Sequence, residues 1–166
     1  MLIEQINGTI EDEEYRGLSI DQVEIEWYES QKKIHRLISQ NGRDIAIRLS
    51  AAGQNRGLRS GDVLTVVDNE ALIIVIRPCS ALVIPFMEQA KMITFCYEIG
   101  NRHAPFYYVP GGKAFALPYE QPLESLLEKL HILFQRAEIC LDGRWKISSA
   151  TGHGHMHTEV EKAHVG

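Results

Sequence analysis

The stretch ALVIPFMEQAKMITFCYEIGNRHAPFYYV (residues 81–109) changes its pattern twice. Its apolar first part is typical of a buried strand, while residues 87–99 place apolar side chains over most of a helical surface. Gly100 is the residue type that ends helices in the left-handed conformation, so we expect residues 101–103 to form the exit loop. A second strand is expected over residues 105–109. The stretch therefore predicts a strand–helix–strand unit.

The chain after this unit repeats the same order of elements. A turn rich in Pro and Gly at 110–112 precedes a strand expected over 114–117, and Pro122 stands at the first turn of a second helix. That helix repeats leucine at the i, i+3, i+4 and i+7 spacing of an amphipathic face (Leu123, Leu126, Leu127 and Leu130). A last strand is expected over 137–141. The resulting βαββαβ order is the ferredoxin-like pattern.

The first half of the chain has the pattern of strands separated by turns. Alternating or continuous apolar residues predict strands over 22–28, 33–39, 45–49, 63–67 and 71–76. Asn41-Gly42 and Asp68-Asn69 predict hairpin turns. Short strands with tight turns indicate a small β-sandwich or barrel, so we expect an α+β protein with an N-terminal β domain (1–77) and a ferredoxin-like domain (78–147). Residues 148–166 lose all periodicity, which predicts a flexible, disordered tail.

Composition predicts a soluble, cytoplasmic protein. The 166 residues are 45% apolar and 23% charged, and the net charge of −5 argues against a surface for nucleic acid. The apolar runs are too short to span a bilayer, and the N-terminus lacks a signal-peptide pattern, so no membrane is expected. Three widely spaced cysteines, Cys79, Cys96 and Cys140, fit core thiols in a reducing compartment rather than a disulfide framework.

The C-terminal tail has the most unusual composition. The sequence GHGHMHTEVEKAHVG (152–166) contains His153, His155, His157 and His164, four of the seven histidines in the chain. Short His-rich tracts are typical of metal binding, and imidazole suits nickel, copper and zinc. A leftover purification tag or a solvated tail is the competing interpretation, although tags usually have contiguous histidines. We therefore interpret the tail as a source of metal ligands.

His103 admits two interpretations. In a single chain its simplest role is to interact with the carbonyl end of the preceding helix, where positive charge is favourable. One histidine cannot hold a transition metal tightly. In a homodimer, however, a two-fold axis would pair two His103 side chains, and the apolar arc of helix 87–99 is wider than one sheet contact needs. A dimer interface at this helix would make His103 half of a metal site.

The remaining candidates point to structure rather than chemistry. His35 falls within a strand pattern, His131 falls at the end of the leucine helix, and residues 11–14 form an acidic, solvated run. The chain contains no Gly-rich phosphate loop, H-E-x-x-H pair or G-x-S-x-G motif. We therefore expect that the protein is not an enzyme. A metallohydrolase built on His103 and nearby carboxylates is a third hypothesis, and it lacks a general-base motif.

The segment YEIGNRHAP (97–105) resembles the urease accessory protein E (UreE) family of nickel metallochaperones. RGLRSGDVL (56–64) and PLESLLEKL (122–130) support the resemblance, which covers nearly the whole chain. It implies an N-terminal β domain that binds partner proteins or peptides, and a ferredoxin-like domain that dimerises. It also implies one Ni(II) held at the interface by His103 of both subunits, and further ligands from the tail. The metal would pass to the accessory GTPase and the urease apoprotein complex.

These interpretations together predict a cytoplasmic nickel chaperone that acts in urease maturation and nickel insertion, as a homodimer or as a tetramer with metal. The predicted metal ligands are His103, His153, His155 and His157, with His164 as a further candidate. Zn(II) or Cu(II) would compete for the same site. The tail is shorter than in some relatives, and residues 115–119 lack the histidines that some carry. The alternative is a protein-interaction and assembly module with incidental metal binding.

Overall fold

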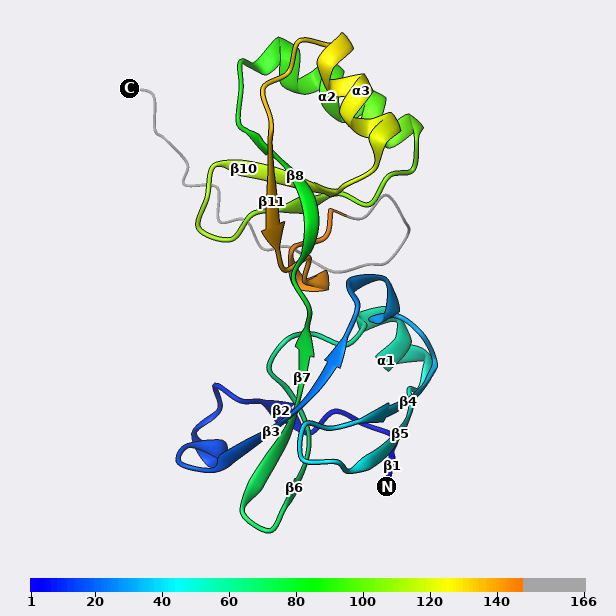
Figure 1. The fold of residues 1–166 in the computed structure, drawn as a ribbon, viewed down its shortest axis with the longest axis vertical. Coiled ribbons are helices and arrows are strands. Elements are labelled where there is room, and N and C mark those ends of the chain that lie inside the picture. Colours follow the sequence, from blue (N-terminus) through cyan, green and yellow to red (C-terminus); the bar gives the residue numbers. More distant parts are fainter. Residues whose placement is uncertain (148–166) are drawn as a thin grey trace, which may run out of the picture.

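The computed structural model describes residues 1–147, which form two domains stacked along the long axis of the molecule (Figure 1). The N-terminal domain lies at the bottom of Figure 1, and the chain passes from it through β7 (Glu70–Ile76) into β8 (Cys79–Pro85) of the upper domain. The α+β fold class is confirmed. The tail that the sequence predicts to be flexible lies outside the described residues.

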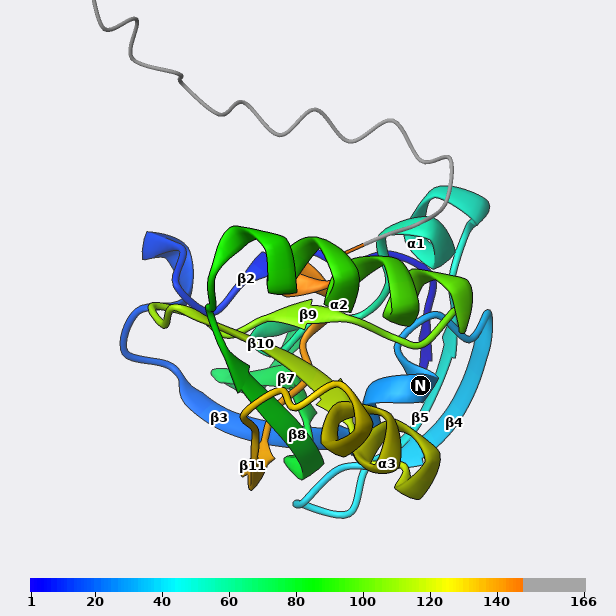
Figure 2. The ribbon, with the colours of Figure 1, turned by 90° about the horizontal axis from the view of Figure 1, so that it is seen from above.

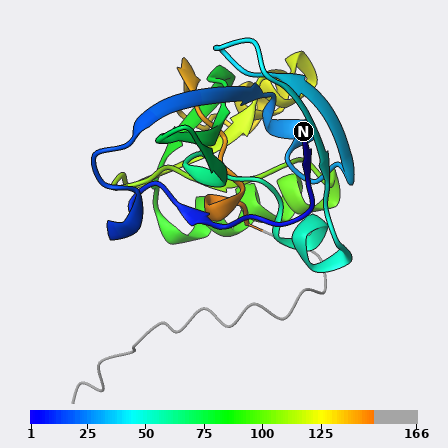
Figure 3. The ribbon, with the colours of Figure 1, turned by 90° about the horizontal axis from the view of Figure 1, so that it is seen from below.

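The N-terminal domain is a sandwich of two sheets. One sheet has the order β1 (Leu2–Ile3), β5 (Asp44–Arg48), β4 (Ile34–Ile38), and the other β2 (Gly8–Thr9), β6 (Asp62–Val67), β7, β3 (Ser19–Ile25). Figure 3, seen from below, shows the N-terminus beside the β4–β5 hairpin. Fully buried side chains from both sheets form one core (Val23, Ile25, Ile45, Ile47, Leu72 and Ile74). Of the two predicted architectures, a small β-sandwich or a barrel, the structure has the sandwich.

Both predicted hairpins are present, and their turn residues explain why. Gly42 has φ of 83° in the connection between antiparallel strands β4 and β5. Asp68 and Asn69 have φ of 51° and 63° and join antiparallel strands β6 and β7. Asn, Asp and Gly tolerate this left-handed conformation better than other residues, which is why these pairs predict turns.

Two predictions for the N-terminal domain are wrong. The strand expected over 22–28 ends at Ile25, and Trp27–Glu29 forms a short 3-10 helix in which the Glu29 carboxylate accepts from the Glu26 backbone N–H. Helix α1 (Ala51–Arg56) was not expected at all. Its signal is local, because Ser50 accepts a hydrogen bond from the Gly53 N–H and Gly57 ends the helix with φ of 73°.

The C-terminal domain has the predicted ferredoxin-like topology. Its elements are β8, α2 (Gln89–Asn101), β9 (Tyr107–Tyr108), β10 (Ala114–Pro118), α3 (Gln121–Lys129) and β11 (Gln135–Ile139). The sheet order is β11-β8-β10-β9, and every neighbouring pair is antiparallel. The first and last strands of the βαββαβ unit thus lie side by side. Pro122 is the second residue of α3, and most predicted boundaries shift by about two residues.

The two helices cover one face of this sheet, the face turned away from the N-terminal domain (Figures 1 and 2). Phe95 and Ile99 of α2 pack with Leu127 of α3 and with strand residues in one core. Phe95 is 0% exposed, and burying such a side chain contributes about 2–3 kcal/mol. None of the helices in residues 1–147 has the length and apolar character needed to cross a membrane.

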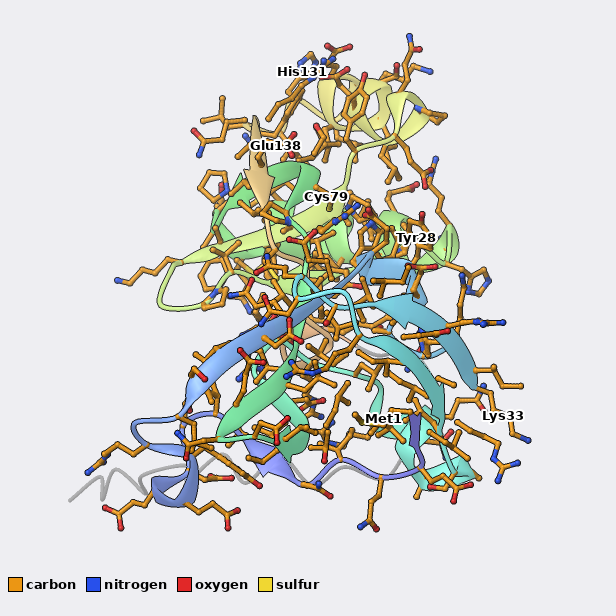
Figure 4. The ribbon with its side chains drawn as sticks, turned by 60° about the horizontal axis from the view of Figure 1, so that its bottom comes forward. Met1, Tyr28, Lys33, Cys79, His131 and Glu138 are labelled. Atoms are coloured by element: carbon orange, nitrogen blue, oxygen red, sulfur yellow. The ribbon has the colours of Figure 1, made fainter. Side chains whose placement is uncertain are left out.

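The other face of the sheet meets the N-terminal domain. Trp27 packs edge-on against Tyr107 with ring centroids 6.4 Å apart and joins a cluster that contains Ala81 and Leu141. Figure 4 shows Tyr28 and Cys79 near this joint, between the two domains. A short 3-10 helix (Gly143–Trp145), orange in Figure 1, also lies between the domains. Side chains from both domains therefore fill the joint.

A candidate metal site at the end of helix α2

Helix α2 ends with His103 in the left-handed conformation, with φ of 51°. The His103 N–H donates to the Gly100 carbonyl at 3.0 Å, and the Ala104 N–H donates to the Ile99 carbonyl at 3.4 Å. This pair of hydrogen bonds is the Schellman motif, which satisfies carbonyls that a helix end would leave free. His103 is thus the residue at which the chain reverses direction.

The prediction that Gly100 ends the helix is wrong, because α2 continues through Gly100 to Asn101. Packing explains the difference. Ile99 is 1% exposed and belongs to the domain core, and Ala104, which the Schellman motif brings back toward it, packs against the same core. The apolar pair sets the point of reversal, so His103 takes the position that glycine usually occupies. A left-handed residue other than glycine costs roughly 1–2 kcal/mol.

Arg102, not the imidazole of His103, provides the positive charge at the carbonyl end of the helix. Its guanidinium donates to the Glu98 carbonyl at 2.9 Å and to the Glu98 carboxylate at 2.6 Å. Within residues 1–147 the imidazole of His103 makes no hydrogen bond, and the residue is exposed. The helix-capping role that the single-chain interpretation gave to His103 is therefore filled by its backbone and by Arg102.

A pocket of about 340 Å³ lies beside His103. Met92 and Cys96 of α2 line it from one side, and Phe106 and Tyr108 from another. Burial raises the pKa of the Cys96 thiol above its ordinary value, which makes the loss of its proton on metal binding less favourable. The pocket is therefore an apolar surface with one exposed imidazole at its margin.

The outer side of α2 is also apolar. Ile93 is 62% exposed and Tyr97, one turn later, is 66% exposed. Side chains four residues apart lie on the same side of a helix, so together they form one apolar strip. The sequence indicated that α2 has more apolar surface than its sheet can cover, and these two residues are that excess.

The other histidines of the described chain lie in different surroundings. His131 has φ of 52° at the end of α3 and lies at the end of the molecule farthest from the N-terminal domain (Figure 4). His35 is 5% exposed, with Nε2 at 3.1 Å from the Lys32 carbonyl, and burial lowers its pKa. Both agree with the structural interpretation of these residues.

The predicted ligands of the tail, His153, His155, His157 and His164, lie outside the described residues. Within residues 1–147 no three His, Cys, Asp or Glu side chains are grouped so that they could hold a metal ion. A single copy of this part of the chain thus provides one imidazole at the site.

The sequence does not indicate where in space residue 147, just before the tail, lies. The Ile147 N–H donates to the Phe106 carbonyl at 2.6 Å, and Ile147 lines the same pocket as His103. Ile147, the last described residue before the histidine-bearing tail, is therefore bound to Phe106. Phe106 follows His103 by three positions in the sequence. No local pattern in the sequence signals this contact, because the two segments are joined only by the fold.

Comparison with known proteins matches both domains. Residues 3–77 match the family model of the UreE urease accessory protein, N-terminal domain, and residues 80–165 match that of its C-terminal domain. The urease accessory protein UreE of Helicobacter hepaticus is 40% identical over 148 residues, which are 89% of this chain and 84% of the relative. That of Helicobacter pylori is 35% identical over 163 residues, 98% of this chain and 95% of the relative.

The two-domain fold and these matches define an accessory protein of urease rather than a urease subunit. The chain belongs to the UreE family of urease accessory proteins. The resemblance seen in the sequence is thereby confirmed.

Proposed function

We propose that this protein is a nickel metallochaperone of urease maturation, and that it binds Ni(II) between two copies of the chain through His103 of each. The observation that carries the proposal is the position of His103. Its imidazole is exposed, makes no hydrogen bond within the described residues, and stands at a costly left-handed helix end beside an apolar surface. His131 at the end of α3 has the same left-handed conformation, so the backbone alone does not mark a site; the exposed imidazole beside an apolar pocket does.

A second copy of the chain would solve two problems at once. It would supply the second imidazole that one copy lacks, since a two-fold axis near His103 duplicates it. It would also cover Ile93 and Tyr97, whose exposed apolar surface is costly in a monomer. The apolar pocket beside His103 offers a recess on the same surface. One dimer interface at α2 would therefore both complete the proposed metal site and cover this apolar surface.

The tail can supply further ligands. Ile147 is held next to the pocket of His103, and His153 follows it by six positions. Six extended residues span at most about 20 Å, so His153, His155 and His157 are within chain length of the site. His164 is a further candidate. Imidazole ligands accept Ni(II), and also Zn(II) and Cu(II), which would compete.

The proposed activity is metal transfer by ligand exchange rather than catalysis. Neutral imidazoles bind the ion, and an incoming ligand from the receiving protein displaces them one at a time. The receivers are the accessory GTPase and the urease apoprotein complex, in the cytoplasm. Mild acid releases the metal because protonated imidazole does not coordinate.

Calorimetric titration with Ni(II) tests this proposal. His103→Ala removes both central imidazoles of the dimer, so tight binding should be lost, while replacing His153, His155 and His157 together by Ala should weaken it. His131→Ala is the matched control, because it changes a second exposed histidine at a helix end. Unchanged nickel affinity in His103→Ala would remove His103 from the site.

A pocket on the N-terminal domain favours the alternative function, a protein-interaction module. This pocket of about 520 Å³ is lined by the segment between β1 and β2 and by α1, including Asn7, Ser50 and Arg56. If the module interpretation holds, the accessory GTPase and the urease complex bind His103→Ala protein as well as the unchanged protein, with and without nickel. A carrier instead needs His103 or nickel for at least one of these complexes.

A further inference from the structure

The segment Leu141–Ile147 connects the N-terminal domain to the pocket of His103. It leaves β11, crosses the joint between the domains and ends where the tail begins (Figure 1). Asp142 at its start is 5% exposed. A buried carboxylate is stable only when several hydrogen bonds compensate for its lost hydration. The hydrogen-bond partners of Asp142 therefore indicate its structural role.

Asp142 and its partner Arg144 together join the segment to Ser60 of the N-terminal domain. The Asp142 carboxylate accepts from the Ser60 N–H at 3.0 Å. It also accepts from the Arg144 N–H at 2.8 Å and from the Arg144 guanidinium at 3.1 Å and 3.2 Å. The same guanidinium donates to the Ser60 carbonyl at 3.2 Å. Both backbone polar groups of Ser60 are thus bound by Asp142 and Arg144.

The Ser60 side chain extends this contact into the N-terminal domain. Its hydroxyl accepts from the Ile76 N–H at 3.0 Å, at the end of β7. The Cys140 thiol, just before the segment, lies 3.4 Å from the Ile76 carbonyl and donates to it. Four backbone groups of the N-terminal domain are therefore satisfied at the joint. Such backbone contacts are specific in geometry, because an unsatisfied buried group is costly.

The other end of the segment is attached to β9 and to the residue before it. Lys146 forms a β-bridge with Tyr107, and the Ile147 N–H donates to the Phe106 carbonyl at 2.6 Å. Phe106 and Ile147 both line the pocket of His103. A continuous series of hydrogen-bonded residues therefore runs from Ser60 to the margin of the candidate metal site.

We propose that Asp142 is a positioning residue, which fixes the segment Leu141–Ile147 against Ser60 so that the histidine tail departs beside His103. The N-terminal domain thereby takes part in metal binding through the place at which it holds the tail, without supplying a ligand. The inference rests on the proposed function.

The test is a double-mutant cycle in the full-length chain, measured as nickel affinity by calorimetry. Asp142→Asn keeps the shape of the side chain but removes its charge, and we expect nickel to bind about tenfold more weakly, as for other residues that orient metal ligands. In a chain whose His153, His155 and His157 are all Ala, Asp142→Asn should leave the affinity unchanged. Arg144→Met, on a more exposed side chain, should give the same pattern with a smaller effect.

The matched control is Asp62→Asn. Asp62 is also buried and also pairs with an arginine, Arg56, but its hydrogen bonds stay within the N-terminal domain. It should reduce stability without changing nickel affinity in the folded protein. An equal loss of affinity from Asp142→Asn with and without the tail histidines would overturn the positioning role, as would no loss in either chain.

Hydrogen exchange on the metal-free protein separates this inference from the proposed function. Asp142→Asn should speed exchange of the Lys146 and Ile147 amides by about tenfold, and Asp62→Asn should not, because local opening controls exchange. If exchange at Ile147 is unchanged, the positioning role fails whatever nickel does. If His103→Ala binds nickel normally, the proposed function fails whatever the exchange shows.

Discussion

His103 and His131 occupy the same position at the ends of the two helices of the ferredoxin-like domain. Each has a positive φ, 51° and 52°, and each follows the last helical turn. At the end of α3 the His131 N–H donates to the Glu128 carbonyl and the Ile132 N–H to the Leu127 carbonyl, both at 3.0 Å. This repeats the hydrogen bonds at His103. His131 is therefore a matched control for substitutions of His103.

Replacing either histidine by glycine should stabilise the protein while only one change removes function. Glycine relieves the left-handed strain at this position, so His103→Gly and His131→Gly should each raise the free energy of unfolding by about 1 kcal/mol in urea titrations. Only His103→Gly should lose tight nickel binding. A lower free energy of unfolding in His103→Gly would contradict the view that the left-handed conformation of His103 is strained.

The strip formed by Ile93 and Tyr97 should control the oligomeric state. Placing a charge in a dimer interface leaves it desolvated and unpaired, so Ile93→Glu or Tyr97→Glu should shift the protein from dimer to monomer in sedimentation measurements. Leu133→Glu is the control, because Leu133 is 80% exposed but lies outside the strip. A dimer that survives both changes on α2, or dissociates with the control, contradicts an interface at this helix.

His35 should make the fold less stable in mild acid. Burial lowers its pKa in the folded state below the ordinary value of about 6.5, which the unfolded chain retains. Below about pH 6.5 the unfolded state therefore binds more protons than the folded state, and stability falls as the pH decreases toward the folded-state pKa.

Urea unfolding at pH 7.5 and pH 5.5 checks this, with His35→Gln as the comparison. The loss of stability between these pH values should shrink in His35→Gln. The pKa values of Asp21 and Glu29 are also lowered in the folded state, so these carboxylates also make the fold less stable in acid. Their effect begins near the ordinary pKa of carboxylic acids, about 4, which lies below the interval from pH 7.5 to pH 5.5. An equal pH dependence in the two proteins would exclude His35 as its source.

Burial should separate two of the carboxylate–arginine pairs of the N-terminal domain in how much each contributes to stability. Asp62 accepts two 2.7 Å hydrogen bonds from Arg56, and its side chain is 3% exposed. Removing it with Ala leaves a partly buried arginine unpaired and should cost about 3 kcal/mol of unfolding free energy. Asp44, 61% exposed and paired with Arg36 at 3.1 Å, should cost less than about 1 kcal/mol. Similar losses would show that geometry matters more than burial.

Much of the fold follows from local patterns. The leucine spacing predicts α3, and Leu123, Leu126 and Leu127 are buried as that spacing requires. Asn41-Gly42 and Asp68-Asn69 predict two hairpins because few residues accept a positive φ. By contrast, Trp27 continues the apolar alternation of β3, yet it lies in a 3-10 helix that turns it toward Tyr107 of the other domain. Tertiary packing there overrides the pattern.

The candidate site divides in the same way. His103 and the tail histidines are visible in the sequence by residue type and by the resemblance to a family. The conformation of His103 is not visible, because Gly100 is the better local signal for a left-handed residue. The packing of Ile99 and Ala104 places that residue three positions later, at His103.

The sequence by itself determined the two domains, the βαββαβ order and the identity of the imidazoles, because periodicity and residue type are local properties. Only the tertiary structure decided that the chain reverses at His103 after α2, that Ile147, the residue before the tail, is held at Phe106, and that Asp142 binds Ser60 across the joint. Each of these contacts depends on where a buried neighbour places the backbone. Contacts between residues as distant as Ser60 and Asp142 leave no periodic trace in the chain.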